Sequence, residues 1–324
     1  MVDYTVIIPV YNEKFYIEKC LDSILNSHKE MSYELLLVDG GSDDGTLEIL
    51  KNYQNKYTGI VNVLYNDKKI APVGMNIGLS NAKGKFIFII SAHASYPENY
   101  FKDLINVCKK TGADCAGPLL ITKIKNKNHV STAIANVLSD KIGTGSTFRS
   151  GANRAMEVDT VPFGCYRSKV FKKIGPYNEK LIRNQDIELN KRLKNAGGKI
   201  ILTPNVQCTY YARENYQELA KNNFENGKWN MLTAYYTGTL KSLSLRHYIP
   251  LIFLLILFSP LLCCYKITLG VFLLYLAVIF TRSRSIKGET TIFHQMAAFL
   301  VLHFSYGAGE LIGLLKIFEL IFKK

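Results

Sequence analysis

Short apolar runs alternate with helix-forming segments over residues 5–90, and this alternation restricts the fold more than any other feature. Strands are predicted at Thr5–Pro9, Leu35–Val38, Val61–Tyr65 and Phe86–Ile90, with helices at 14–26, 47–53 and 73–81 between them. Strands joined by helical crossovers pair in parallel. The sequence therefore predicts an α/β fold with a mostly parallel, helix-covered sheet.

Polar loops follow the first, second and fourth of these strands. They are Tyr11-Asn12-Glu13, a Gly- and Asp-rich run from Asp39 to Thr46, and Ser91-Ala92-His93. In open α/β sheets ligands bind beyond the carboxyl ends of the strands, so the three loops should converge on one cleft. Neither GxGxxG nor GxxxxGK[ST] is present at these loops, which weighs against a dinucleotide dehydrogenase and a P-loop NTPase.

Asp186 follows a polar loop and opens a predicted helix whose apolar positions are Ile187, Leu189 and Leu193. Two roles are open to it. Capping the helix N-terminus is the commonest role of such an aspartate. The other role is that of a general base with its carboxylate directed at the cleft, and the converging loops favour this second role.

Three apolar segments follow residue 247, at 248–264, 267–281 and 291–322. The first two should form a membrane hairpin that turns near Tyr265-Lys266, with the second segment short for a full crossing. The third is either one tilted helix or a hairpin broken at 305–309. Basic clusters at Lys241/Arg246 and Arg282/Arg284/Lys287 flank the first two segments and predict a cytoplasmic position for both clusters.

The charge and the cysteines agree with a cytoplasmic head on a membrane tail. The net charge is +14, but the lysines are dispersed and lack an aromatic-basic nucleic-acid platform, so anionic lipid is the expected partner. None of the seven cysteines forms a CxxC pair, and neither a disulfide nor a zinc site is expected. No basic n-region and long apolar h-region precede the first strand, so the head is expected to stay in the cytoplasm.

Together these residues resemble inverting glycosyltransferases of family 2, which have the GT-A fold. The resemblance runs from Val6 to about Trp229 and is strongest to the membrane-attached branch that builds succinoglycan-type exopolysaccharides. Its landmarks are TVIIPVYNE at 5–13, VDGGSDDGT at 38–46, Asn76, Gly78, Ala82-Lys83-Gly84, VPFGCYRSKVFKKIG at 161–175 and RNQD at 183–186. It implies a catalytic domain at 1–212, interfacial helices at 213–247 and membrane-embedded helices at 248–324.

The resemblance also implies roles for individual residues. An acceptor hydroxyl attacks the anomeric carbon of a nucleotide sugar, and Asp186 removes its proton. Asp186 follows Gln185, where the family more often has glutamate. The residues expected to bind the donor are Pro9, Tyr11, Glu13, Asp39, Gly41, Asp43, Asn76, Ser91, Arg149 and Arg183, with Asp39 the expected uracil contact. For Arg149 and Arg183, as for Arg154 and Arg167, a solvated surface arginine is the alternative.

The chain departs from the family pattern at the end of the fourth strand. Most relatives have a DxD triplet there, which binds a divalent cation, whereas this chain has Ser91-Ala92-His93. His93 occupies the metal-binding position, and its imidazole suits Mn²⁺ better than Mg²⁺. Two hypotheses stay open: a divalent cation is held through His93, or His93 or a nearby Lys or Arg contacts the phosphates directly.

The expected function is transfer of a sugar from a nucleotide donor, expected to be UDP-linked, to a lipid-linked polyprenyl saccharide in surface polysaccharide synthesis at the membrane. One alternative is transfer to polyprenyl phosphate itself. A second is a membrane module that binds a nucleotide sugar without catalysis. A helix predicted at 214–230, which holds the single Trp229, is either interfacial or an ordinary packing helix.

Overall fold

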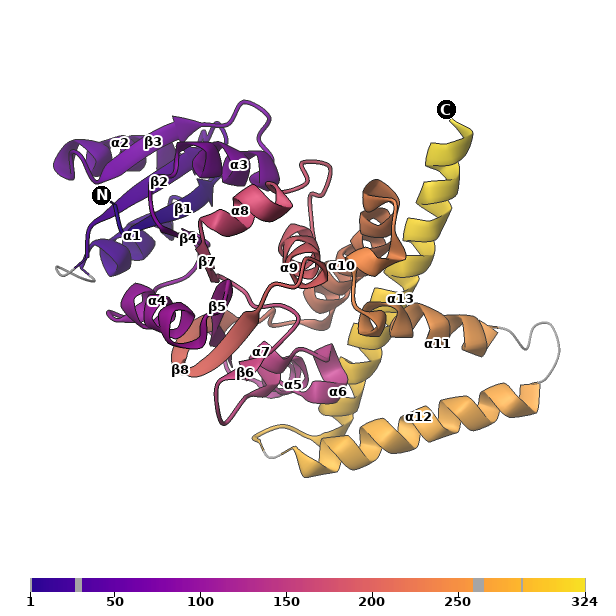
Figure 1. Cartoon of the computed structure of the whole chain (residues 1–324). Coiled ribbons are helices and arrows are strands. Elements are labelled where there is room, and N and C mark those ends of the chain that lie inside the picture. The colour runs from indigo at the N-terminus through magenta and orange to yellow at the C-terminus, as the bar shows by residue number, and fades with distance from the viewer. Residues whose placement is uncertain (1, 27–30, 259–264, 287, 324) are drawn as a thin grey trace. The chain divides into compact units, whose positions relative to one another are not determined.

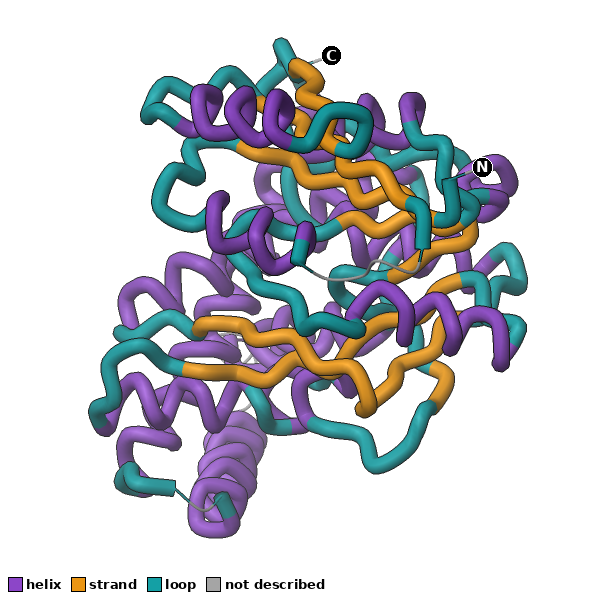
Figure 2. Tube along the Cα trace, turned by 90° about the vertical axis from the view of Figure 1, so that its left-hand side faces the viewer, coloured by secondary structure: helices purple, strands orange, loops and turns teal. Residues whose placement is uncertain are grey.

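The computed structural model describes residues 2–26, 31–258, 265–286 and 288–323. Among these residues eight strands form one sheet in the order β3-β2-β1-β4-β7-β5-β8-β6 (Figures 1 and 2). The strands are β1 (Tyr4–Val10), β2 (Tyr33–Asp39), β3 (Val61–Tyr65), β4 (Phe86–Ile89), β5 (Cys115–Lys123), β6 (Met156–Glu157), β7 (Cys165–Arg167) and β8 (Ile200–Tyr211).

Strands β1 to β4 pair in parallel, with β1 between β2 and β4 and with β3 at the edge. The predicted α/β fold with a mostly parallel sheet is confirmed for this half. The other half is mixed, because β7 pairs antiparallel with both β4 and β5, and β6 pairs antiparallel with β8. β6 and β7 have two and three residues, too few for an alternating pattern to predict a strand.

Helices follow the first strands as predicted, with shifted ends. They are α1 (Ile17–Leu25), α2 (Thr46–Lys56), α3 (Ala71–Asn81) and α4 (Tyr100–Thr111). The face of α1 that packs inward carries Ile17, Leu21 and Ile24, all fully buried. Gly78 brings α3 against β1, because a Cβ at this position would overlap the side chain of Ile7. The close packing of α3 against β1 therefore explains why Gly78 is among the residues that carry the family resemblance.

The contacts within the chain form two compact units. The first comprises Met1–Ile121 and Gly151–Thr209, and it includes α8 (Lys169–Ile174) and α9 (Gln185–Asn195). The second comprises Thr122–Ser150 and Tyr210–Lys324. Nothing in the sequence pattern indicated that 122–150 belongs with the C-terminal helices. The predicted functional division at residues 212 and 247 stays a prediction.

The second unit is helical apart from the ends of two strands. Its elements are α5 (His129–Leu138), α6 (Lys141–Thr144), α7 (Thr147–Ser150), α10 (Tyr216–Thr237), η1 (Leu240–Ser242), η2 (Leu245–Tyr248), α11 (Ile249–Phe258), α12 (Tyr265–Ser285) and α13 (Ile292–Phe322). Its apolar core joins α5, α10, α12 and α13 through residues such as Ile134, Leu219, Ile279 and Phe299. Segments far apart in sequence thus share one core.

The structure corrects two predictions about the apolar tail. The membrane hairpin was predicted to turn near Tyr265-Lys266, but these two residues do not form a turn, because both begin α12. The second apolar segment is also longer than predicted, since α12 continues through the polar residues up to Ser285 and reaches 21 residues. Residues 259–264, at the end of the first predicted segment, lie outside the described residues. The third segment is one continuous helix of 31 residues, α13.

Both α12 and α13 are long and apolar enough to cross a membrane. They differ in how much protein covers them, because 39% of an 18-residue apolar stretch of α13 is buried, compared with 11% of such a stretch in α12. Helix α10 lies along α13 (Figure 1), and a Cβ at Gly227 or Gly309 would overlap a backbone carbonyl oxygen of the other helix. Packing therefore accounts for this face of α10, the helix predicted at 214–230.

Candidate active site

The first two polar loops meet in the first unit, as predicted. Asn12 adopts a left-handed backbone conformation with φ of 54°, which asparagine tolerates better than most residues. Its side-chain amide donates to Asp43 Oδ1 at 2.9 Å, and its Oδ1 accepts from the Asp43 N–H at 3.0 Å. Its backbone N–H donates to Ser42 Oγ at 3.0 Å. These bonds hold the end of β1 against the loop after β2.

Asp39, at the end of β2, is fully buried and shapes that loop. Its Oδ2 accepts from the N–H groups of Gly41 at 2.9 Å and Ser42 at 3.1 Å, and its Oδ1 accepts from Ser42 Oγ at 2.6 Å. Gly41 has φ of 79°, a conformation that glycine adopts without strain. The Lys69 side chain lies against the same glycine. Asp39 thus holds the turn that the sequence predicted as a nucleoside site.

The third loop joins the other two through His93. The ring Nε2 lies 2.7 Å from Glu13 Oε1, and the ring meets Tyr16 edge to face at 5.0 Å. The Ser91 hydroxyl accepts from the His93 N–H at 3.2 Å, so Ser91 orients the backbone of this loop. The Glu13 side chain is 12% exposed and that of His93 60% exposed. A mostly buried carboxylate therefore holds an accessible imidazole.

The residues at this point fit a divalent cation in part. No group of three or more His, Cys, Asp or Glu side chains gathers in a metal-binding arrangement within the described ranges. However, Glu13 Oε2 is buried and has no hydrogen-bond partner among the residues that the structure describes. An unpartnered carboxylate oxygen beside an imidazole nitrogen is a donor pair suited to Mn²⁺. Glu13 and His93 could therefore hold a cation whose remaining ligands come from elsewhere.

Asp186 lies in the first turn of α9. The helix begins at Gln185, and its N-cap position belongs to Asn184, which has φ of 61°. The N-cap alternative for Asp186 is therefore wrong. Its Oδ1 instead accepts from the Ile187 N–H at 2.9 Å. The left-handed Asn184 turns the chain immediately before the helix, which fixes the position of Asp186 within the first turn.

The surrounding protein atoms raise the pKa of Asp186. Burial raises the pKa of its carboxyl group, and a smaller opposing effect comes from the bond that the Ile187 N–H donates. Asp186 is nevertheless exposed to solvent, although protein atoms surround its carboxyl group, and this exposure moderates the shift. The pKa of Tyr166 and that of Tyr177 are raised, mainly by their own burial and in part by the negative charge of Asp186. The charge of Asp186 thus acts on two buried phenols, and the surroundings of its own carboxyl group favour the protonated form.

Asn76 and Asn190 brace the surroundings of Asp186. The Asn76 side chain pairs with the backbone of Tyr177 in both directions, each bond 2.9 Å long, and it also donates to Glu179. Tyr166 donates its hydroxyl to Asn190 Oδ1 at 2.8 Å, and Asn190 lies one turn after Asp186 on α9. Asn76 was predicted to bind the donor. Its contacts are those of a residue that positions the loop before α9.

The predicted arginines and the remaining donor residues have different surroundings. Arg149 belongs to the second unit, where its guanidinium stacks 4.1 Å from the Tyr210 ring centre and where burial lowers its pKa. Arg167 donates to the Cys108 and Ala113 carbonyl oxygens, which is a structural role. The other three predicted residues lie in the first unit: Pro9 in β1, Tyr11 just after β1 and about half exposed, and Arg183 just before α9.

Sequence reasoning missed three residues around these loops. Lys69 lies against Gly41, Lys14 lies against Gly45, and Tyr16 packs on His93. Lys69 itself has φ of 58°, a backbone conformation that its sequence neighbours do not indicate. The position of Lys14 one residue after the first polar loop was a signal that could have been used. These side chains add two positive charges beside the loop that Asp39 shapes.

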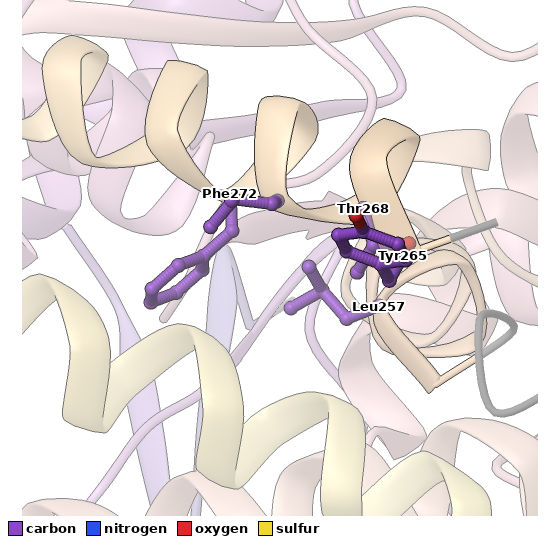
Figure 3. A pocket seen from close by; sticks show the side chains of 5 residues that line it. Leu257, Tyr265, Thr268 and Phe272 are labelled. Carbon is purple, nitrogen blue, oxygen red and sulfur yellow. The ribbon is translucent and has the colours of Figure 1, made fainter.

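A separate hollow of about 410 Å³ lies in the second unit, at α11 and α12 (Figure 3). Its lining is Leu257, Tyr265, Thr268, Leu269 and Phe272. These side chains offer two hydroxyl groups and no charge. The hollow suits an apolar occupant and has none of the groups that bind a nucleotide.

Comparisons with known proteins agree with the resemblance seen in the sequence. Residues 5–175 match the family model described as "Glycosyl transferase family 2". The dolichyl N-acetyl-alpha-D-glucosaminyl phosphate 3-beta-D-2,3-diacetamido-2,3-dideoxy-beta-D-glucuronosyltransferase of Methanococcus voltae is 32% identical over 69% of this chain and 71% of its own length. The succinoglycan biosynthesis protein ExoA of Rhizobium meliloti is 30% identical over 64% of this chain and 63% of its own length.

Solved structures share the fold at low sequence identity. The mannosyltransferase PcManGT from Pyrobaculum calidifontis, in complex with GDP-Man and Mn²⁺, has a TM-score of 0.58 at 14% identity, over 97% of this chain and 86% of that one. S. aureus TarS 1-349 in complex with UDP-GlcNAc has a TM-score of 0.52 at 15% identity, over 99% and 92%. The GT-A fold is thereby confirmed. The family model matches more than half of the length of this chain, and the chain therefore belongs to glycosyl transferase family 2 and is a glycosyltransferase.

Proposed function

We propose that this glycosyltransferase moves a sugar from a UDP-linked donor to a lipid-linked saccharide, with inversion at the anomeric carbon. The observation that carries the proposal is the meeting of three polar loops at the carboxyl ends of β1, β2 and β4, in the unit that also holds Asp186. Ligands of α/β sheets bind at this edge. The membership in the family supports the reaction, and this geometry supports a donor at that edge.

Asp186 acts as the general base. The acceptor hydroxyl oxygen attacks the anomeric carbon while Asp186 takes the hydroxyl proton, and the bond from that carbon to the diphosphate breaks. The nucleoside diphosphate leaves with the bonding electron pair. Burial raises the pKa of Asp186, which brings its basicity closer to that of an effective base at neutral pH.

The donor is held by the loop that Asp39 shapes and by the residues beside it. We assign the nucleoside end to Pro9, Tyr11, Asp39, Gly41 and Asp43, whose loops are tied together by the Asn12 bonds. The UDP-GlcNAc complex of the TarS neighbour, which shares the fold, is consistent with a UDP donor. A divalent cation, when bound, would neutralise charge that develops on the leaving diphosphate.

Membrane attachment through α12 supports a lipid-linked acceptor. Large apolar side chains cover the outside of this helix, among them Ile267, Leu273 and Leu274, each more than half exposed. An apolar surface of this length is stable when lipid covers it. The name of the Methanococcus voltae relative contains a dolichyl phosphate-linked sugar, which is a lipid-linked acceptor. We propose that the acceptor here is of this class and that the first unit lies on the cytoplasmic face.

The test is transfer of labelled sugar from a panel of nucleotide sugars to a membrane lipid extract. Asp186→Asn should reduce kcat by about 10²–10⁴-fold while UDP binding persists, because only the base is lost. Asp22→Asn is the matched control, since Asp22 is an exposed aspartate near the C-terminal end of α1 in the first unit. Turnover by Asp186→Asn equal to that of the parent chain would refute the base assignment.

The pH profile and the stability of the same variant provide a second check. Since the pKa of Asp186 is raised, kcat/KM should rise with pH through a value above that of an ordinary aspartate. A raised carboxyl pKa stabilises the fold below the unfolded-state pKa, and this contribution is lost as pH rises through the folded-state pKa. Asp186→Asn should therefore unfold at the parent temperature or above it at neutral pH. An acid limb at the ordinary aspartate value would contradict this role.

A further inference from the structure

The contact between Glu13 and His93 joins two strand ends that are eighty residues apart in sequence. The imidazole Nε2 and the carboxylate Oε1 are 2.7 Å apart, and the Tyr16 ring packs against the edge of the imidazole. Glu13 is also fixed through its backbone, whose N–H donates to Thr46 Oγ1 at 2.9 Å. Both side chains therefore come from loops that the fold holds in place, and their contact is a built feature of the first unit.

The second carboxylate oxygen of Glu13 needs a partner that the described residues do not supply. Oε2 is buried and accepts no hydrogen bond from any residue in the described ranges. A buried polar atom left unsatisfied is costly, so native structures rarely retain one without a function or a ligand. A cation at this oxygen would satisfy it, and the imidazole is bonded to the other oxygen of the same carboxylate.

We propose that Glu13 and His93 together hold a divalent cation, and that Glu13 supplies the carboxylate that Ser91 does not. This inference rests on the proposed function, because oxygens of the donor diphosphate complete the coordination. The carboxylate ligand then comes from the end of β1 and the imidazole from the end of β4. The site of charge neutralisation is kept although the acidic triplet is absent.

Cation binding would change the contact between the two side chains. Nε2 and Oε1, 2.7 Å apart, share a hydrogen bond, and the imidazole gives up this bond when Nε2 and the carboxylate coordinate the cation. Imidazole and carboxylate as a mixed pair select Mn²⁺ over Mg²⁺, which prefers oxygen ligands. Two protein ligands bind a cation weakly on their own, and cations at phosphate-transfer sites commonly take further ligands from the substrate. Mn²⁺ and UDP should therefore bind cooperatively.

The experiment measures Mn²⁺ binding rather than turnover. The free Mn²⁺ signal in electron paramagnetic resonance is titrated with the full-length protein in detergent, without and with UDP. We expect UDP to tighten Mn²⁺ binding at least tenfold, and we expect Glu13→Gln and His93→Ala each to remove at least tenfold of the affinity seen with UDP. Echo-envelope modulation from an imidazole nitrogen should appear in the parent chain and be absent from His93→Ala.

Glu48→Gln is the matched control, because it makes the same chemical change on an exposed side chain of α2. It should bind Mn²⁺ as the parent chain does, and thermal unfolding shows that each variant is folded. Parental Mn²⁺ binding by Glu13→Gln with UDP would overturn the inference. The inference would also be overturned if UDP bound equally tightly with and without a metal chelator. That result would favour direct phosphate contact by His93 and leave the proposed function intact. Failure to bind UDP or any nucleotide sugar would overturn the proposed function itself.

Discussion

The contact between α10 and α13 allows a graded test of the second unit. A Cβ at Gly313 would lie 2.6 Å from the Lys228 carbonyl oxygen and 2.9 Å from Met231 Cβ, whereas real Cβ atoms essentially never approach within 3.0 Å. For Gly313→Ala the helices must therefore separate by about 0.4 Å. Overpacking of this size costs about 1–3 kcal/mol.

Two further alanine substitutions bracket this value. Gly309→Ala should cost more, because its Cβ would overlap the Phe224 carbonyl oxygen and lie 3.0 Å from the Lys228 nitrogen. Gly309 and Gly313 form a GxxxG pair, which allows helix backbones to approach closely. Gly270→Ala is the control, because beyond the backbone of its own helix no atom of the described residues lies within 4 Å of its added Cβ on α12. Alanine favours the helix there by up to about 1 kcal/mol.

The assay is thermal unfolding in detergent followed by tryptophan emission. Trp229 is the single tryptophan and lies on α10, next to Lys228, so its emission reports on this contact. The unfolding temperature of Gly313→Ala should fall by roughly 2–12 °C. That of Gly309→Ala should fall further, and that of Gly270→Ala should not fall. Parental unfolding temperatures and emission for both Gly309→Ala and Gly313→Ala would refute the backbone contact.

Three more perturbations test separate parts of the structure. Asn190→Ala should cost about 2–3 kcal/mol in chemical denaturation, because the buried Tyr166 hydroxyl loses its acceptor; an unchanged midpoint would contradict that bond. Arg282→Ala should lower the free energy of unfolding by about 1–2 kcal/mol, because it leaves the Asp140 carboxylate, whose side chain is 3% exposed, without its cation. The effect is limited because the Arg282 side chain is 41% exposed to solvent. Arg282→Lys should recover part of the loss in the same assay. Burial raises the pKa of the Cys20 thiol to about 12, so thiol reagents should label it only on unfolding, and rapid labelling of the native chain would show that it is accessible.

Local patterns predicted the nucleotide half of the fold well. The alternation of apolar strands and amphipathic helices is a short-range property, and it placed β1 to β4 and the helices between them within a few residues. The polar loops at their ends were found for the same reason, because parallel strands present their carboxyl ends at one edge. The helix at Asp186 was also predicted, although its cap is Asn184, since a left-handed backbone leaves little signal in the sequence.

In the C-terminal helices, hydropathy alone did not predict where each helix begins and ends. It identified three apolar stretches, but the polar residues at both ends of α12 continue the helix, so Tyr265-Lys266 belong to α12 and not to a turn. Whether 291–322 was one helix or two depended on packing, because Gly307 and Gly309 can break a helix or allow a close neighbour. The structure has the second arrangement, with these glycines inside α13 against α11 and α10.

The sequence by itself determined the family, the parallel half of the sheet and the loops that hold the candidate residues. Each of these is encoded by neighbours along the chain, through the period of the apolar residues and the chemistry of the turns. Only the tertiary structure decided that 122–150 joins the C-terminal helices, that Glu13 meets His93, and that Asn76 braces the loop before α9. These contacts join residues far apart in sequence, and their partners are selected by packing in three dimensions.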